Sequence, residues 1–206
     1  MREFFKESGG ELVLEHGSID YNLLAVAQKM FMRNGFKVIN VPWRVPKSYQ
    51  QETTDIDLDI WINSEEDVGS AEQGFIYLDH LGKLEKGCFQ ATTPCFRTEA
   101  EMSKLHLPYF MKLELYVNDP NCVNEDYVES LANFVISLYN HFVLTYFNTS
   151  PTIVKVATND GFDIEINGIE VGSYGLRHSK KLGISWVYGT GIALPRFTIG
   201  LDNEQK

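Results

Sequence analysis

The sequence has 206 residues, of which 44% are hydrophobic and 13% aromatic, so it holds enough apolar side chains for one domain, residues 1–206, with a buried core. Its formal net charge of −10 excludes a general electrostatic attraction to nucleic acid. No apolar run reaches the length of a membrane span, and the charged N-terminus lacks the apolar segment of a signal peptide. We therefore expect a cytoplasmic protein that does not enter a membrane.

The first predicted element is an amphipathic helix over residues 18–34. Its apolar residues recur at helical spacing. Ser18 or Asp20 is a suitable N-cap, and Gly35 is placed where a helix commonly ends. The pattern therefore predicts a helix with one face against the core.

Three segments follow this helix. Residues 36–43, FKVINVPW, alternate as a strand does and end near Pro42, which a strand tolerates only at its end or edge. The acidic stretch 52–69 contains DIDLDIWI at 55–62, whose strict alternation predicts an exposed strand or hairpin. A helix from Ser70 to about Lys86 is expected next.

The rest of the chain alternates long strands with two helices. Residues 88–99 and 109–117 are predicted strands joined by a polar loop, and 124–147 is the clearest helix, with acidic residues in its first turn and an apolar stripe. Further strands are predicted over 152–158, 161–166, 169–176 and 184–189, followed by a Gly-rich turn and a last helix up to 203. This order predicts an α+β domain with a mostly antiparallel sheet.

Charged residues occupy the two long central strands. Arg97 and Glu99 are two positions apart and share one face, and Phe110, Lys112 and Glu114 share a face of the returning strand. Burying such charges without partners would be very costly. The face is therefore either solvated or lines a polar ligand site, in which the Arg suits a phosphate and the Phe suits a base.

A second set of polar residues lies in the late strands. The segment FDIEINGIEVGSYG contains Asp163, Glu165, Glu170 and Ser173. Such oxygen ligands suit Mg²⁺ bridged to phosphates. The alternative is a hairpin with one polar face.

The segment GTGIALPR differs from a dinucleotide fingerprint, because its third Gly is missing and no βαβ unit precedes it. Gly189 and Gly191 are expected in a turn that a ligand approaches closely, followed by a helix whose N-terminus favours an anion. Arg196 would lie near that anion. Together with the residues above, this predicts an ATP site without a P-loop, since no GxxxxGK[ST] occurs.

Two other groups are expected to be passive. The cationic cluster Arg177–Lys181 is interpreted as a solvated loop. Cys88, Cys95 and Cys122 are odd in number and form no CxxC pair, which favours reduced thiols. Cys88 and Cys95 with His106 could serve as metal ligands, but the usual zinc spacings are absent, so no zinc is predicted.

These motifs, in this order, resemble the catalytic domain of class II aminoacyl-tRNA synthetases, most closely the seryl and prolyl type. NGFKVINVPW is similar to motif 1, CFRTEAEMSKLHLPYFMKLEL to motif 2 and GTGIALPR to motif 3. SAE at 70–72 resembles the T-x-E loop of the family, FDIE resembles its Y-D-I-E, and EVGS at 170–173 resembles its E-x-x-S. The resemblance extends over roughly residues 18–203.

The resemblance implies a role for each matching residue in ATP binding. Arg97 would grip the ATP α-phosphate, Glu99 would bind the adenine amino group or orient the loop, and Phe110 would stack on adenine. Arg196 would lie on the other side of the adenine or at the γ-phosphate. The remaining implied ATP and Mg²⁺ contacts are Glu170 and Ser173, which would hold both, and Gly189 and Gly191.

The resemblance also implies a second substrate and a partner. Glu72, Lys112 and Glu114 would bind an amino acid, whose carboxylate attacks the α-phosphate to give an aminoacyl-adenylate and pyrophosphate. Catalysis of this kind rests on positioning and electrostatics, mainly by Arg97 and Arg196. A homodimer through the motif 1 segment around Pro42 is implied as well.

The sequence departs from the family in ways that leave the acceptor open. It carries no recognisable tRNA-binding domain, and its motif 2 loop is short and weakly basic. Truncated relatives that load carrier proteins use a zinc held by two Cys and a Glu, but no Cys lies between residues 170 and 190. We favour an adenylating ligase with a non-tRNA acceptor: a carrier protein, a protein side chain or a small amine. The alternatives are a non-catalytic regulatory paralogue, or a minimal synthetase that works with a tRNA-binding partner.

Overall fold

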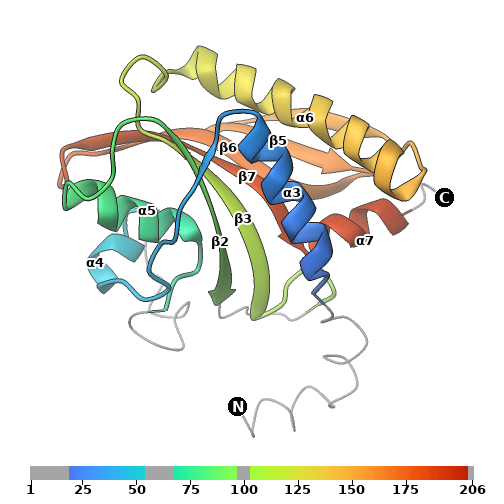
Figure 1. Ribbon diagram of the computed structural model, residues 1–206, viewed down its shortest axis with the longest axis horizontal. Helices are drawn as coiled ribbons and strands as arrows, with labels where there is room; N and C mark the ends of the chain where they lie inside the picture. Colours follow the sequence, from blue (N-terminus) through green and yellow to red (C-terminus); the bar gives the residue numbers. More distant parts are fainter. Residues whose placement is uncertain (1–18, 54–66, 97–102, 204–206) are drawn as a thin grey trace, which may run out of the picture.

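A computed structural model of the chain describes residues 19–53, 67–96 and 103–203. These residues form one seven-stranded sheet with helices on both faces (Figure 1). The strand order is β1-β2-β3-β7-β6-β5-β4, and every pair of neighbours is antiparallel except β1 and β2. The predicted α+β class with a mostly antiparallel sheet is confirmed.

The strands are β1 (Lys37–Val38), β2 (Cys88–Phe96), β3 (Tyr109–Val117), β4 (Ile153–Thr158), β5 (Gly161–Ile166), β6 (Ile169–Ser179) and β7 (Ile184–Leu194). The helices are α3 (Tyr21–Arg33), α4 (Lys47–Gln50), α5 (Ala71–His80), α6 (Glu125–Phe147) and α7 (Arg196–Asp202).

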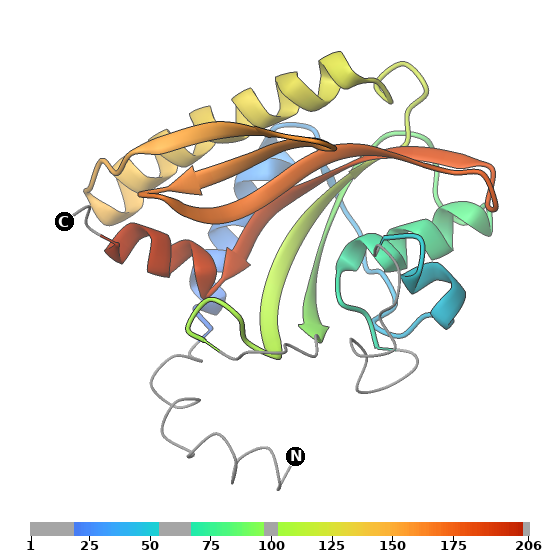
Figure 2. The same cartoon turned by 180° about the vertical axis from the view of Figure 1, so that it is seen from behind.

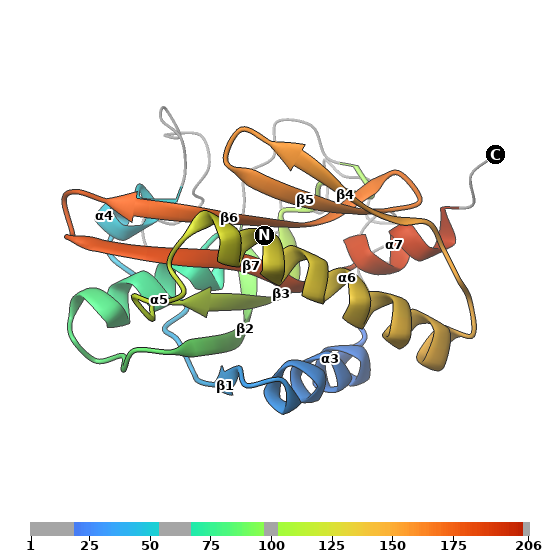
Figure 3. The same cartoon turned by 90° about the horizontal axis from the view of Figure 1, so that it is seen from above.

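Helices α3 and α6 lie on the same side of the sheet, as the view from above shows (Figure 3). Together with α7 they cover the larger hydrophobic core, to which α3 contributes Leu23 and Phe31, α6 contributes Tyr139 and Phe142, and α7 contributes Phe197. Helix α5 packs on the opposite face through a smaller core. Between α5 and α7, strands β2 and β3 are not covered by a helix (Figure 2).

The ends of the two longest helices follow the sequence signals. The Asp20 carboxylate accepts a hydrogen bond from the Leu23 N–H at 2.9 Å, and Gly35 follows the helix with a left-handed φ of 92°. The Asn124 side chain accepts from the Tyr127 N–H at 2.8 Å and caps α6. The helices predicted over 18–34 and 124–147 are therefore confirmed, with Asp20 as the cap of the first.

Some predicted elements differ from the structure. The strand expected over 36–43 is only Lys37–Val38, so Pro42 lies beyond it, and the helix expected to reach Lys86 ends at His80. The predicted turn at Gly189–Gly191 is wrong, because strand β7 continues to Leu194. The strand or hairpin predicted at 55–62 lies outside the described residues.

A β-bulge interrupts the pairing of β5 with β6. Ile164 lies opposite Gly172, but the next residue, Glu165, lies opposite Glu170, so Val171 is an extra residue on β6. A strand normally directs residues three apart to opposite faces. The extra residue changes this alternation at the start of β6.

A second bulge interrupts the pairing of β3 with β7. Leu113 lies opposite Ile192 and Glu114 opposite Thr190, so Gly191 is the extra residue. A Cβ built on Gly191 would lie 2.1 Å from Leu113 Cδ2, and the Gly191 carbonyl accepts a hydrogen bond from the Tyr139 hydroxyl at 2.9 Å. Gly191 therefore serves close packing at the bulge.

The fold generates a prediction at the turn between β4 and β5. Gly161 and Gly168 both have a positive φ, 147° and 79°, but only at Gly161 would a Cβ meet backbone, at 2.1 Å from the Tyr174 carbonyl oxygen. We expect Gly161→Ala to lower the free energy of unfolding by roughly 3 kcal/mol, and Gly168→Ala by only about 1–2 kcal/mol. Urea unfolding measures both. Equal losses of unfolding free energy in the two variants would show that the close approach of the Tyr174 carbonyl on β6 does not restrict the side chain at position 161.

Candidate functional site

A cavity of about 380 Å³ lies on the open face of the sheet. Its walls come from α4 and the loop after it, the start of α5, strands β3, β6 and β7, the loop before β3 and the start of α7. We name its two ends after residues in their walls. The Phe110 end contains Phe110, Leu105, Leu107, Glu170, Pro195 and Arg196, and the Glu72 end contains Ser70, Glu72, Gln73, Arg177 and Tyr188.

At the Phe110 end an arginine bridges two walls. Arg196, at the start of α7, donates to the Leu105 carbonyl at 3.0 Å and to the Glu170 carboxylate at 3.4 Å. The Glu170 side chain is 47% exposed and that of Arg196 is 25% exposed. This ion pair is long and open to solvent. A ligand anion can therefore replace Glu170 as the partner of Arg196, or a cation can replace Arg196 as the partner of Glu170, at little cost in free energy.

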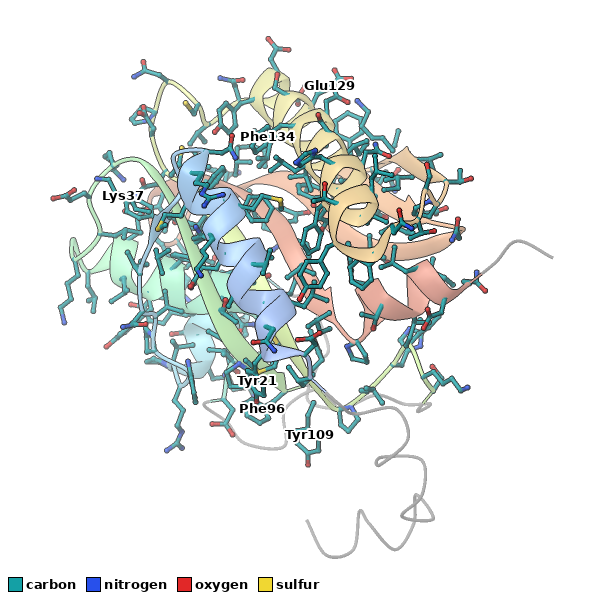
Figure 4. All side chains as sticks on the ribbon, turned by 45° about the vertical axis from the view of Figure 1, so that its right-hand side comes forward. Tyr21, Lys37, Phe96, Tyr109, Glu129 and Phe134 are labelled. Carbon is teal, nitrogen blue, oxygen red and sulfur yellow. The ribbon has the colours of Figure 1, made fainter. Side chains whose placement is uncertain are left out.

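Two aromatic rings lie where β2 ends and β3 begins, next to the Phe110 end of the cavity. Phe96 and Tyr109 lie together at the ends of these strands, with ring centroids 5.9 Å apart in an edge-to-face arrangement (Figure 4). Phe96 lines the cavity, as does Phe110, whereas Tyr109 does not. The two phenylalanines offer flat apolar surface at this end of the site.

Ser173 and Glu170 share the cavity although they are three residues apart on one strand, because the bulge at Val171 restores them to one face. The Ser173 hydroxyl donates to the Asp163 carboxylate at 2.6 Å. The E-x-x-S spacing noted in the sequence therefore corresponds to a bulged strand that presents two oxygen groups to one space.

At the Glu72 end, both oxygens of a buried carboxylate have partners. Glu72 Oε2 accepts from Arg177 at 2.5 Å, and Oε1 accepts from the Trp186 indole N–H at 2.7 Å. Glu72 lies in the first turn of α5, after the Ser70 N-cap. Through these two contacts Glu72 joins α5 to Arg177 on β6 and to Trp186 on β7.

A second buried carboxylate, Glu114 on β3, holds the start of the same helix. Its oxygens accept hydrogen bonds from the Ser70 hydroxyl at 2.7 Å and from the Glu72 amide at 3.1 Å, and Lys112 lies 2.7 Å away. Burial alone would raise the pKa of the Glu114 carboxyl, but the Lys112 charge and these hydrogen bonds stabilise the ionised form, and the pKa lies below its ordinary value.

Arg177 packs against an aromatic ring in the cavity wall. Its guanidinium carbon lies 4.2 Å from the centre of the Tyr188 ring. That ring covers Gly175, where a Cβ would approach the Tyr188 hydroxyl to 2.5 Å. Burial, partly offset by the nearby guanidinium, raises the pKa of the Tyr188 hydroxyl, which therefore stays protonated at neutral pH.

The structure brings six predicted site residues to one cavity: Glu72, Phe110, Lys112, Glu170, Ser173 and Arg196. Glu114 lies directly behind Lys112 and is bonded to Ser70 of the wall. Gly189 and Gly191 do not line the cavity, because their missing side chains face Tyr174 and Leu113 in the core. Arg97 and Glu99 lie outside the described residues, so their placement stays a prediction.

Sequence reasoning missed three residues at the Glu72 end: Arg177, Trp186 and Tyr188. The prediction of a solvated loop at 177–181 is wrong for Arg177, since β6 continues to Ser179, although Lys180 and Lys181 are exposed in the turn. The signal was present: Ser173, Gly175 and Arg177 alternate along a strand that was predicted to end at Leu176.

Within residues 19–53, 67–96 and 103–203, no three His, Cys, Asp or Glu side chains gather closely enough to hold a metal ion by themselves. Of the helices in this described part of the chain, none has both the length and the apolar character needed to cross a membrane.

No protein-family model and no curated protein sequence matches this chain. Solved structures do match. The chain is similar to seryl-tRNA synthetase from Pyrococcus horikoshii in complex with ATP, with a TM-score of 0.66 and 18% identity over 89% of this chain and 50% of that one. It is also similar to pyrrolysyl-tRNA synthetase from Desulfitobacterium hafniense, with a TM-score of 0.63 and 17% identity over 89% of this chain and 70% of that one.

A further structure of D. hafniense pyrrolysyl-tRNA synthetase, PylSc, matches with a TM-score of 0.66 and 17% identity over 97% of this chain and 75% of that one. The chain therefore has the fold of class II aminoacyl-tRNA synthetase catalytic domains, and it spans half the length of the seryl-tRNA synthetase chain. The expected resemblance in fold is confirmed.

The buried Glu114 generates a pH prediction. A carboxyl whose pKa is lower in the folded state adds stability above its unfolded pKa, and that stability is lost as the pH falls below it. We expect Glu114→Gln to cost about 3 kcal/mol of unfolding free energy at pH 7, because Lys112 loses its partner, and less at acidic pH. The measurement is urea unfolding from pH 7 to about pH 3.5.

The matched control is Glu85→Gln, which changes an exposed carboxylate and should leave the stability nearly unchanged at every pH. A loss for Glu114→Gln that stays constant with pH would contradict an ionised Glu114 in the folded protein.

Proposed function

We propose that this protein activates a carboxylic acid of the amino-acid class with ATP, forming an acyl-adenylate and pyrophosphate, and then transfers the acyl group to an acceptor other than tRNA. An oxygen of the substrate carboxylate forms a bond to the α-phosphorus while the bond from that phosphorus to the α,β-bridging oxygen breaks. The electron pair leaves with pyrophosphate. No protein nucleophile is required.

The observation that carries the proposal is the order of side chains along one cavity. Phe110, Glu170 and Arg196 lie at one end, Ser173 shares the face of Glu170, and Glu72, Arg177 and Tyr188 lie at the other end. An aromatic shelf, a cation and hard oxygen ligands suit a nucleotide with its phosphates. The more enclosed Glu72 end suits a small acid. The likeness in fold to a seryl-tRNA synthetase solved with ATP supports the same arrangement.

The residues fit Mg²⁺ as a partner of the phosphates. Glu170 and Ser173 would hold it, because Mg²⁺ is commonly bound by one or two protein oxygen groups while phosphates and water complete its coordination. When bound, Mg²⁺ neutralises phosphate charge. Glu170 would exchange its long contact with Arg196 for the metal, which leaves Arg196 to bind phosphate or adenine.

The proposed roles of the other predicted residues are those that the resemblance to class II synthetases implies. Phe110 stacks on adenine, and Lys112 orients the carboxylate that reacts. Arg97 on the adjoining segment stabilises the charge on the α-phosphate, and Glu99 binds the adenine amino group. Glu114 holds Lys112 and the start of α5 in place, and it is too buried to receive a substrate ammonium directly.

The acceptor is proposed to be a carrier-protein thiol, a protein side chain or a small amine. The net charge of −10 disfavours a tight complex with tRNA. We propose further that the chain acts in the cytoplasm as a homodimer formed through the motif 1 segment, where Val38 and Trp43 are exposed.

The test is acid-dependent exchange of pyrophosphate into ATP by the purified chain, with Mg²⁺ and without tRNA. We expect exchange with one or a few members of a panel of amino acids. ATP binding without exchange for any member would contradict adenylation and favour a regulatory paralogue. Exchange that requires added tRNA would favour a minimal synthetase.

Phe110 generates a sharper prediction. We expect Phe110→Ala to raise the KM for ATP about tenfold, because stacking on a base contributes roughly 1–3 kcal/mol, and to change the KM for the acid much less. Phe110→Tyr should retain ATP binding because it keeps the ring.

Tyr109→Ala is the matched control, since Tyr109 neighbours Phe110 but lies outside the cavity lining. An equal effect of Phe110→Ala on both substrates would assign Phe110 to packing rather than to the adenine site.

A further inference from the structure

We infer that the acid activated at this site carries a second anionic group, bound by Arg177 at the Glu72 end of the cavity, so that the substrate class is an acidic amino acid or a related dicarboxylate. The assignment of the reaction rests on the proposed function. The binding of an anion at Arg177 rests on the arrangement of charges alone.

In each of two ion pairs at the Glu72 end, the cation is more exposed than its carboxylate. The Arg177 side chain is 32% exposed, whereas that of its partner Glu72 is 7% exposed. The Lys112 side chain is 16% exposed, whereas that of Glu114 is 5% exposed. Both cations line the cavity; Glu114 lies behind Lys112 and does not line it, whereas Glu72 lines it beside Arg177 but is less exposed.

The two carboxylates are already engaged. Glu72 accepts from Arg177 and Trp186, one partner for each oxygen. Both oxygens of Glu114 accept from Ser70, and one also accepts from the Glu72 amide. A cationic side chain of the ligand placed at Arg177 would lie against the guanidinium and gain little from the covered carboxylates, so the charge arrangement disfavours a cationic group there.

Arg177 retains donors for a ligand. A guanidinium has five N–H donors in a planar fork, and the contact with Glu72 uses only one terminal nitrogen. Contact with the Tyr188 ring and the bond to Glu72 hold the guanidinium in place before any ligand binds. Such a preorganised fork suits a carboxylate, which it can bind with two parallel hydrogen bonds.

Arg177 lies further along β6 than the proposed phosphate position. Ser173, at the proposed phosphate position, and Arg177 are four residues apart on the strand, which corresponds to about 13 Å. The Arg177 guanidinium lies over Tyr188, which pairs with Gly175, and Glu72 on α5 binds it there. Glu170, which with Ser173 would hold the phosphates and Mg²⁺, is seven residues from Arg177 on the same strand. We therefore assign the anion at Arg177 to the second substrate.

The experiment compares acids that differ by one charge. Pyrophosphate exchange by the full chain is measured with aspartate, glutamate, their amides asparagine and glutamine, and serine. We expect kcat/KM for one acidic substrate to exceed that for its amide at least about tenfold, which is the value of one charged hydrogen bond. Exchange that favours a neutral or cationic amino acid would overturn this inference and leave the proposed adenylation intact.

Two variants test whether Arg177 causes the preference for the acid over its amide. Arg177→Gln together with Glu72→Gln removes the pair without leaving a buried lone charge, and should abolish the preference for the acid over its amide. Lys181→Gln is the matched control, because it removes an exposed cation from the same hairpin at a residue outside the cavity lining. Acid preference that survives in the double variant would overturn the role of Arg177.

Calorimetric titration separates this inference from the proposed function if no acid supports exchange. Aspartate and glutamate are titrated into the wild-type chain and into the double variant. Binding by the wild type that the double variant lacks would support the anion site even without adenylation. If the acids do not bind the wild type, or bind both proteins equally, the inference is wrong.

Discussion

The site depends on two buried ion pairs that fasten the start of α5 to the sheet. Glu114 on β3 binds Ser70 and the Glu72 amide, and Glu72 in turn binds Arg177 on β6 and Trp186 on β7. Removing such charges from water is expensive, and only complete pairing with further hydrogen bonds offsets the cost. Here each carboxylate oxygen has a partner, so the helix that forms one wall of the cavity is held at a defined position over three strands.

Two β-bulges adapt the sheet to this site. The extra residue Val171 on β6 lets Glu170 and Ser173 face one cavity, and the extra residue Gly191 on β7 lets Thr190 and Ala193 do the same. In each case two residues three positions apart lie on the same face of the sheet, whereas in a regular strand they would lie on opposite faces. The same strands are covered on their other face by α3, α6 and α7, which form the larger hydrophobic core with them. One face of the sheet therefore provides stability and the other provides the site.

The charge of the whole chain and the charge of the cavity point to different partners. A net charge of −10 repels polyanions at long range, whereas within the cavity Lys112, Arg177 and Arg196 each offer a cation to a small anionic ligand. This combination agrees with the proposal of ATP and an acid as substrates and of an acceptor smaller or less charged than tRNA. The fold is shared with synthetases at only 17–18% identity, so the substrate must be argued from the side chains of this chain.

The sequence by itself determined the elements whose signals are local: the capped helices α3 and α6, the strand pair β2–β3 and the α+β class. It also predicted as site residues Phe110, Lys112, Glu170 and Arg196, which line one cavity in the structure. These follow from periodicity, caps and charges on strands. Only the tertiary structure decided how far β6 and β7 extend, where the bulges lie, and that Arg177 and Trp186 meet Glu72 across more than 100 residues of chain. Local patterns carry no information on strand register or on pairing between distant segments, because packing of the whole sheet sets both.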